Sequence, residues 1–426
     1  MPGDRLTAVY LLETPLDPAK VADVLAGEQS SGTFLRVPGE TDDLRARSRA
    51  TVDSIEELES VAAPSLRSGW LERQGRGQGQ GGPYRRARVT VSFPTGNIGT
   101  NLATLAATVA GNLYDLGEAT GLKLMSLTLP SDYRRQFAMP HQGIDGTRRL
   151  TEVYGRPLLG TIIKPNVGMT AAQTGELVAE MCAAGLDFIK DDEVNADSVW
   201  APVGARIRAV MARVRAHQDR TGRRVMVAFN ISDETDAMRR HADLITAEGG
   251  SCAMVSLNWC GLSAVQSLRR STDLAIHGHR NGFGMLSRAS ALGMAAPAYQ
   301  TLYRLAGIDH MHVHGLGGKF ADFEDDVTAA TRDCLTPLSY DDAVMPAFSS
   351  GQWAGTLPMT YAATRSPDFM FLCGGGIIAH PDGPSAGVTS LLAAWAAVKD
   401  GETLEARAAH VPELKRALEF FGARSK

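Results

Sequence analysis

The sequence predicts an α/β protein with two parts: an N-terminal α+β domain of the ferredoxin-like kind (residues 1–140) and a C-terminal eightfold β/α (TIM) barrel (residues 141–426). Two observations carry this prediction. The chain has 426 residues, which suits a barrel of about 250 residues plus a smaller domain. From residue 150 onward, eight apolar runs alternate with helix-like segments, which is the repeating order that closes into a barrel.

Composition excludes several classes of function. The formal net charge is -4, and aromatic residues make up 6% of the chain, so we expect no nucleic-acid partner. No apolar run reaches the roughly 18 residues that a membrane span needs, so we expect a cytoplasmic protein without a membrane partner. The cysteines have no paired spacing, which favours reduced thiols over disulfides or a zinc site. They are Cys182, Cys252, Cys260, Cys334 and Cys373.

The first 140 residues alternate strand and helix patterns. Strand patterns cover residues 9–13, 87–93 and 122–129, and helical spacing covers 18–27 and 101–116. This order is typical of an α+β domain with an antiparallel sheet.

The segment after the first helical pattern, residues 28–34, contains an acid, several hydroxyl groups and a glycine. It is either a polar helix cap or a place where Thr33 and backbone NH groups face an anion.

The apolar runs of the second part are continuous rather than alternating, as expected for parallel strands that are buried on both faces. Helical patterns such as residues 171–184 and 236–248 connect them. Barrel enzymes place their chemistry at the C-terminal ends of the strands, so the residues at those ends are the candidates for a site. The eight runs are residues 158–164, 188–192, 224–230, 252–257, 274–279, 310–314, 344–350 and 368–375.

The most informative strand end is Gly-Leu-Asp-Phe-Ile-Lys-Asp-Asp-Glu at residues 185–193, where an apolar run delivers one lysine and three acids to a single point. Adjacent carboxylates repel one another, and Mg²⁺, which prefers oxygen ligands, would resolve the conflict. Lys190 carbamylated by CO₂ would add a carboxylate-like oxygen beside Asp192 and Glu193. The structural alternative is a solvated acidic loop with a lysine counter-ion.

Other strand ends carry groups suited to phosphate binding and proton transfer. Arg280 and His312 are candidates for holding a phosphate. The glycines Gly374, Gly375 and Gly376 follow the eighth run, where barrels often bind phosphate through backbone NH groups. Lys164 and His279 are rival candidates for moving a proton.

The segment after the sixth run, Gly-Leu-Gly-Gly-Lys-Phe at residues 315–320, has the glycines of a hinged lid with Lys319 at its tip. Nearby histidines leave two interpretations open: His277, His310 and His314 are either further site groups or ordinary core residues.

Together these residues resemble the large subunit of ribulose bisphosphate carboxylase, and more closely the RuBisCO-like proteins, over nearly the whole chain. Residues 160–165 (Gly-Thr-Ile-Ile-Lys-Pro) are similar to the family's first barrel strand, and residues 185–193 to its metal-binding motif. Further similar segments are residues 277–280 of the fifth strand, 309–312 with 318–319 of the sixth strand and lid, 349–351 of the seventh strand and 373–376 of the eighth.

The resemblance implies Mg²⁺ held by carbamylated Lys190 with Asp192 and Glu193, and a phosphorylated keto sugar or keto sugar acid as substrate. It adds Ser349 and Gly351 to the groups that bind substrate. Glu28, Thr33 and Asn112 resemble residues that complete the active site of a neighbouring subunit, which implies a homodimer or a higher oligomer with shared active sites.

Three departures from the carboxylase bear on the reaction. Asn166 replaces a second lysine, Ile162 replaces a threonine that contacts substrate, and Phe34 replaces a tryptophan beside the phosphate. We therefore expect metal-assisted enolisation but not ribulose bisphosphate carboxylation. Lys319 matches a lid lysine that contacts a carboxylate, which favours a carboxy-lyase: a decarboxylase of a 3-oxo sugar acid phosphate, of the 3-oxo-isoapionate 4-phosphate type, in carbohydrate catabolism.

Three alternatives stay open. One is a transcarboxylase/hydrolase of the same substrate. Another is a methylthio-pentose phosphate enolase or isomerase of methionine salvage, which predicts an apolar pocket for the thioether and no dependence on Lys319. The third, of another class, is a non-catalytic assembly or regulatory protein, although selection for folding alone would not favour three crowded charges.

Overall fold

The computed structural model describes residues 4–32, 37–76, 82–339 and 342–423, and the chain divides into two compact units. The first unit comprises Met1–Phe137 and Gly282–Leu305, and the second comprises Ala138–Asn281 and Ala306–Lys426. The chain therefore returns to the first unit once, between the fifth and sixth barrel strands. The sequence, which suggested a division between residues 140 and 141, gave no sign of this return.

The first unit is built on a five-stranded sheet in the order β10-β4-β1-β3-β2. Neighbouring strands are antiparallel except for β10, which runs parallel to β4. The expected strand segments lie within β1, β3 and β4, apart from the final residue of the last. The strands are β1 (Arg5–Thr14), β2 (Thr51–Val61), β3 (Tyr84–Pro94), β4 (Gly121–Thr128) and β10 (Leu292–Met294).

Edge strand β2 was missed because it has no alternation to detect: all its residues are exposed or half-buried, and charged residues lie along it. The predicted helix at residues 101–116 is shorter than expected, because it stops before Gly111 and continues as a 3-10 turn. The helices of this unit are α1 (Pro18–Glu28), α2 (Asp42–Ser48), α3 (Gly69–Arg73), η1 (Thr95–Asn97), α4 (Leu102–Ala110), η2 (Asn112–Asp115), α5 (Ser131–Arg134), α12 (Gly284–Ser287) and α13 (Ala296–Ala306), which ends at the return to the barrel.

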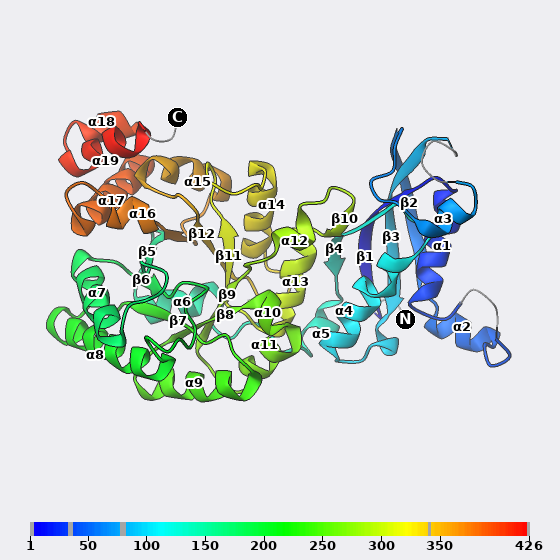
Figure 1. The fold of residues 1–426 in the computed structure, drawn as a ribbon, viewed down its shortest axis with the longest axis horizontal. Coiled ribbons are helices and arrows are strands. Elements are labelled where there is room, and N and C mark those ends of the chain that lie inside the picture. Colours follow the sequence, from blue (N-terminus) through cyan, green and yellow to red (C-terminus); the bar gives the residue numbers. More distant parts are fainter. Residues whose placement is uncertain (1–3, 33–36, 77–81, 340–341, 424–426) are drawn as a thin grey trace. The chain divides into compact units, whose positions relative to one another are not determined.

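The second unit is a closed barrel of parallel strands in the order β11-β12-β13-β5-β6-β7-β8-β9 (Figure 1). Each strand lies inside one of the eight apolar runs, so the predicted α/β architecture is confirmed. The barrel strands are β5 (Leu158–Ile162), β6 (Phe188–Lys190), β7 (Met226–Asn230), β8 (Cys252–Ser256), β9 (Ala275–His279), β11 (His310–His314), β12 (Met345–Ser349) and β13 (Met370–Leu372).

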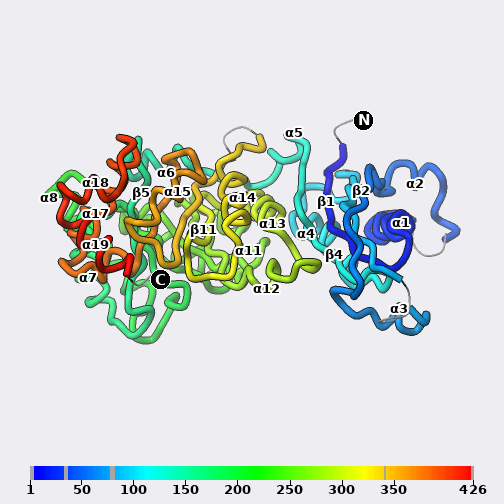
Figure 2. The backbone as a smooth tube through the Cα atoms, turned by 90° about the horizontal axis from the view of Figure 1, so that it is seen from above, coloured from blue at the N-terminus to red at the C-terminus, as the bar shows by residue number. Residues whose placement is uncertain are grey.

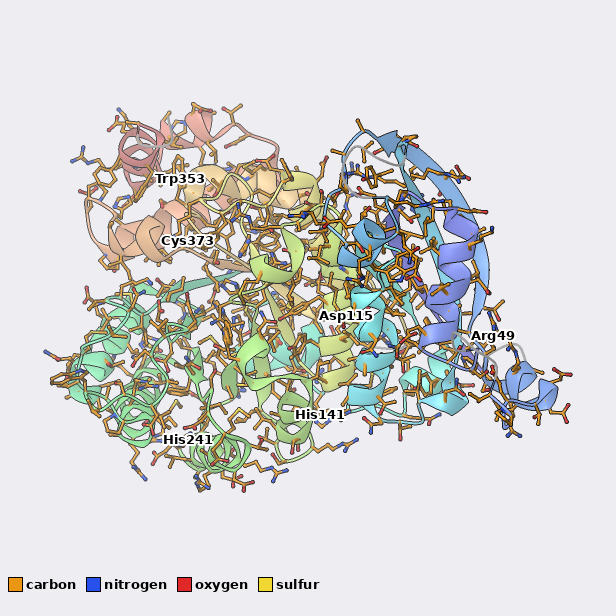
Figure 3. The ribbon with its side chains drawn as sticks, turned by 45° about the vertical axis from the view of Figure 1, so that its right-hand side comes forward. Arg49, Asp115, His141, His241, Trp353 and Cys373 are labelled. Carbon is orange, nitrogen blue, oxygen red and sulfur yellow. The ribbon has the colours of Figure 1, made fainter. Side chains whose placement is uncertain are left out.

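Helices follow the barrel strands, and the last three pack together in both ribbon and tube views (Figures 1 and 2). Trp353, which Figure 3 labels, follows β12 in the chain. Its ring packs against that of Phe421 in the last helix at a tilt of 43°, with ring centroids 5.7 Å apart. None of the described helices combines the length and apolarity needed to cross a membrane. The helices are α6 (Gly143–Thr151), α7 (Ala171–Ala184), α8 (Val203–Thr221), α9 (Thr235–Ala247), α10 (Leu257–Cys260), α11 (Leu262–Arg269), α14 (Glu324–Leu335), η3 (Ala354–Thr356), α15 (Leu357–Thr364), α16 (Gly374–Ile378), α17 (Pro384–Asp400), α18 (Leu404–Ala408) and α19 (Pro412–Gly422).

The barrel interior is filled by apolar side chains such as Phe188 and also holds two of the histidines whose role was open. His277 and His310 are fully buried, and their rings lie 5.4 Å and 6.1 Å from the Phe188 ring. His310 Nε2 also lies 2.7 Å from Thr147 Oγ1. Both histidines are therefore core residues, and burial lowers the pKa of His310 to about 4.

We expect His310 to make the fold acid-labile. The unfolded chain binds a proton at this imidazole near its usual pKa of 6.5, whereas the folded chain does not until about pH 4, so stability falls as the pH falls through that window. Urea denaturation at pH 7 and pH 5 measures how far the free energy of unfolding falls between the two pH values. That fall should be about 2 kcal/mol smaller in His310→Gln than in wild type. Exposed His410→Gln is the control, and equal losses in all three proteins would contradict the expectation.

Candidate active site

Predicted site residues at or just after the ends of three barrel strands form one polar cluster. Asp192 Oδ2 lies 2.6 Å from the Lys164 ammonium, which also donates to Asn166 Oδ1 at 2.7 Å. Glu193 Oε2 lies 4.0 Å from Lys190 Nζ and 3.6 Å from His279 Nε2. The ends of β5, β6 and β9 are thereby linked through two carboxylates.

The expectation that all four charges of the Lys-Asp-Asp-Glu run meet at one point was wrong for Asp191. Successive side chains along an extended segment point in opposite directions. Asp191 is buried on the other side, where its Oδ2 accepts from Arg206 Nε at 3.1 Å and from the Asn230 backbone NH at 2.9 Å. Burial raises the pKa of this carboxyl, and the Arg206 guanidinium opposes that shift.

The backbone of the acidic run is fixed by Asn230, the last residue of β7. Its side-chain amide donates to the carbonyl oxygens of Asp192 and Glu193, each at 3.1 Å, while its own oxygen accepts from Ser232. The backbone that carries both carboxylates is therefore fixed by β6, which precedes it in the chain, and by Asn230 of the neighbouring strand β7.

Lys190 is fully buried, and its ammonium has few polar contacts among the described residues. Nζ donates to the Asp191 carbonyl at 2.9 Å and lies 3.7 Å from Met254 Sδ. Burial lowers the Lys190 pKa to about 8, although Glu193 and Asp192 oppose the shift. More of this amine is thus neutral near pH 7 than in an exposed lysine, and the neutral amine is the form that reacts with CO₂.

Asp192 and Glu193 supply two carboxylates, and a third oxygen arises at Lys190 only if its amine is carbamylated. Among the described residues, no three His, Cys, Asp or Glu side chains are grouped as metal ligands. The donor set nevertheless has the oxygen chemistry that Mg²⁺ prefers. The roles assigned to these residues stay predictions.

Within the same cluster, the His279 ring lies against that of His312, with ring centroids 4.1 Å apart. Burial lowers the pKa of both imidazoles well below the usual range, with Lys190 adding to the shift at His279 and His279 adding to that at His312. Both rings are therefore neutral at pH 7. Arg280, next in the chain, is 3% exposed, and Ser349 at the end of β12 is 4% exposed.

The three glycines after β13 form the first turn of α16, where backbone NH groups have no partner within the helix. At Gly376 a Cβ atom would lie 2.4 Å from the Gln352 carbonyl oxygen, so only glycine fits there. Gly374 and Gly375 have more room. Gly351 has a φ of 83°, in the region that favours glycine, and it follows Ser350 at 72°.

The predicted residues of the N-terminal domain are in the first unit. Glu28 ends α1 and Asn112 begins η2, and both are exposed. Thr33 lies outside the described residues, as does Phe34. Their expected role in the site of a neighbouring subunit stays a prediction.

Lys319 lies between β11 and α14 in an exposed segment, with its Nζ 5.4 Å from the centre of the Phe320 ring. His314, the remaining histidine of open role, is not a core residue, since its side chain is 22% exposed; its Nδ1 is hydrogen-bonded to Asp322.

Sequence reasoning missed three supporting residues: Arg206, Asp322 and Gln352. Their partners lie 15, 8 and 36 positions away, on other elements or loops, where periodicity within one segment gives no information.

The family model described as ribulose bisphosphate carboxylase large chain, catalytic domain, matches residues 143–421. The chain is 46% identical to a 3-oxo-isoapionate-4-phosphate transcarboxylase/hydrolase of Xanthobacter autotrophicus, over 98% of this chain and 100% of that protein. It is 39% identical to a 3-oxo-isoapionate-4-phosphate decarboxylase of Rhizobium etli, over 98% of both chains.

Among solved structures, a rubisco-like protein of Burkholderia fungorum superposes with a TM-score of 0.92 at 62% identity, covering 98% of this chain and 100% of that one. The chain therefore belongs to the ribulose bisphosphate carboxylase large-chain family, among its RuBisCO-like proteins. The resemblance inferred from the strand-end motifs is confirmed.

We predict that Arg206→Met destabilises the protein strongly, because it leaves the Asp191 carboxylate buried without its charged partner. Breaking a buried pair in this way typically costs about 3–5 kcal/mol. The double variant Asp191→Asn/Arg206→Met should recover part of that loss, since no charge is then left alone. Urea denaturation of both variants checks this. A double variant no more stable than Arg206→Met alone would contradict it.

Proposed function

We propose that this protein is a Mg²⁺-dependent carboxy-lyase that acts on 3-oxo-isoapionate 4-phosphate or a closely similar 3-oxo sugar acid phosphate. The observation that carries the proposal is the polar cluster of Lys164, Lys190, Asp192, Glu193 and His279 at one end of the barrel. Relatives that share 46% and 39% of their residues with the chain bear names that specify this substrate.

Mg²⁺ would be held by Asp192, Glu193 and carbamylated Lys190. When bound, it supplies Lewis-acid stabilisation of negative charge on substrate oxygens. The burial of Lys190 favours carbamylation, because it raises the neutral fraction of the amine. Asn230 holds the backbone that carries both carboxylates, so the ligands need little rearrangement.

Other residues of the barrel would bind the phosphate and donate hydrogen bonds to the substrate. Arg280, His312, Ser349, Gly351 and the first turn of α16 would bind the phosphate and so orient the sugar acid. Neutral His279 and His312 can donate a hydrogen bond without placing another positive charge beside Lys190.

In the reaction, the bond between the carboxylate carbon and its neighbour breaks, and the electron pair moves toward the keto oxygen. CO₂ leaves, and a proton returns to carbon. Lys164 and His279 are the two candidates to deliver that proton. The ammonium of Lys164 is already hydrogen-bonded to Asp192 within the cluster.

A second outcome on the same substrate is transcarboxylation followed by hydrolysis. It is favoured by the higher identity of the relative with that name, 46% against 39% for the decarboxylase. Both outcomes begin by breaking the same bond to the carboxylate. Methylthio-pentose phosphate enolisation is less well supported, because the groups at the barrel mouth are charged or polar rather than suited to a thioether.

The assembly and location are also proposals. We infer a homodimer or a higher oligomer in which Glu28, Thr33 and Asn112 complete a neighbouring subunit's site, as the family resemblance implies. We infer a cytoplasmic location.

We expect ¹³C and ³¹P NMR to detect loss of ¹³CO₂ and a new ketose phosphate from carboxyl-labelled 3-oxo-isoapionate 4-phosphate, after preincubation of the protein with Mg²⁺ and bicarbonate. Glycolate with phosphoglycerate would instead identify the transcarboxylase/hydrolase outcome. Parallel incubation with 5-methylthioribulose 1-phosphate is the comparison. Turnover of that compound alone would overturn the proposal, and turnover of neither would favour a non-catalytic role.

Lys190→Ala should abolish turnover, because the third oxygen donor is lost. A readout independent of activity is the carbamate itself: wild type incubated with ¹³C-bicarbonate and Mg²⁺ should give a carbamate signal on the lysine-containing peptide after chemical trapping. Lys190→Ala should not. Lys415→Ala, on an exposed face of α19, is the matched control and should keep both the signal and the activity. A signal in Lys190→Ala equal to wild type would refute the assignment.

Lys319→Met should lower kcat/KM for decarboxylation by about 100-fold, because a positive charge that contacts the substrate carboxylate is removed. Lys319→Arg should retain part of the activity, since the charge stays. Steady-state measurement of CO₂ release distinguishes the variants. Unchanged kinetics in Lys319→Met would favour the methylthio-sugar interpretation, which does not need this lysine.

A further inference from the structure

The segment that carries Lys319 is closed at its base by a side-chain pair. We use the term lid loop for residues 315–323, which connect the end of β11 to the start of α14. His314, the last residue of β11, is hydrogen-bonded through Nδ1 to Oδ2 of Asp322, eight positions further on. The pair therefore joins a barrel strand to the far end of the lid loop.

A chain of ring contacts runs from this pair to Lys319. The ring of Phe320 packs on that of His314, with centroids 4.5 Å apart and an interplanar angle of 37°. Lys319 Nζ lies 5.4 Å from the centre of the same Phe320 ring, within the range of a cation–π contact. The position of the ammonium thus depends on a ring that rests on His314.

The near end of the lid loop is fixed separately, by Gln352 from the segment after β12. Its Nε2 donates to the Leu316 carbonyl at 3.1 Å, and its Oε1 accepts from Thr356 at 3.1 Å. A Cβ atom on Gly315 would lie 1.9 Å from Gln352 Nε2, so the chain passes directly against this amide. Gln352 thus holds the near end of the lid loop, and the His314–Asp322 pair joins its far end to β11.

The pair is partly open to solvent, with His314 and Asp322 side chains 22% and 19% exposed. The hydrogen bond from His314 lowers the pKa of Asp322, against the opposing effect of burial, so the carboxylate is charged at neutral pH. A small hollow of about 100 Å³ adjoins the pair and the lid-loop glycines. The lid loop therefore has room to change its packing when the hydrogen bond between His314 and Asp322 is broken.

We propose that His314 and Asp322 are positioning residues: their hydrogen bond closes the base of the lid loop and, through Phe320, sets the position of Lys319. The catalytic part of this inference rests on the proposed decarboxylation. The mechanical part does not, because it concerns the folded chain without substrate.

The central variant is Asp322→Asn, with Asp325→Asn as its matched control. Asp325 lies three positions along the chain on an exposed face of α14, so the same chemical change is made without touching the pair. Two further variants separate the contacts of His314. His314→Asn keeps a donor for Asp322 but removes the ring beneath Phe320, whereas His314→Phe keeps a ring and removes the donor.

The first measurement is limited trypsin digestion of the full chain without substrate, following cleavage after Lys319 by mass spectrometry. Loss of a partly exposed pair worth about 1 kcal/mol predicts cleavage about fivefold faster in Asp322→Asn and in His314→Phe. Asp325→Asn should match wild type. Unchanged cleavage rates in both Asp322→Asn and His314→Phe would overturn the proposal, whatever the activity of the protein.

The second measurement asks whether the pair acts through Lys319. Asp322→Asn should lower kcat by about fivefold with little change in KM, because only the placement of Lys319 is altered. In the Lys319→Met background, Asp322→Asn should then have no further effect. An equal loss in both backgrounds would overturn the proposal and mean that the pair acts on substrate directly. If no substrate is turned over, the proposed function fails while the digestion still decides the mechanical part.

Discussion

The site depends on one constraint, the burial of the Lys190 ammonium at the end of β6. Closing the barrel removes this side chain from water, and a buried ammonium is costly unless it is paired, neutralised or modified. Among the described residues its contacts are a carbonyl, a thioether and the Glu193 carboxylate at 4.0 Å, and burial lowers its pKa to about 8. The carbamylation that we propose for Lys190 would turn an unfavourable cation into an anionic ligand.

The surrounding charges are distributed so that Asp191 does not neutralise Lys190. Asp191 is instead committed to Arg206 and to the backbone of Asn230. Had it turned inward, three carboxylates would have met beside one lysine, and their repulsion would have opposed folding. The buried Asp191–Arg206 ion pair is thus separate from the candidate ligands Lys190, Asp192 and Glu193.

Much of the fold could be predicted from the sequence, because parallel barrel strands are buried on both faces and read as continuous apolar runs. Strands β2 and β10 could not, since β2 is a charged edge strand and β10 is three residues long and half-buried. The different environments of the histidines could not be predicted from the sequence either. His277, His310, His312 and His314 all lie at strand positions, yet two are core, one faces His279 and one pairs with Asp322.

The sequence by itself determined the barrel, the family and the kinds of side chain at each strand end, because these follow from residue order and local burial. Only the tertiary structure decided which of those side chains meet. Contacts such as Asp191 with Arg206, Glu193 with His279 and Leu316 with Gln352 join different strands and loops. Their geometry is set by how the barrel closes, and no periodicity within a single segment encodes that closure.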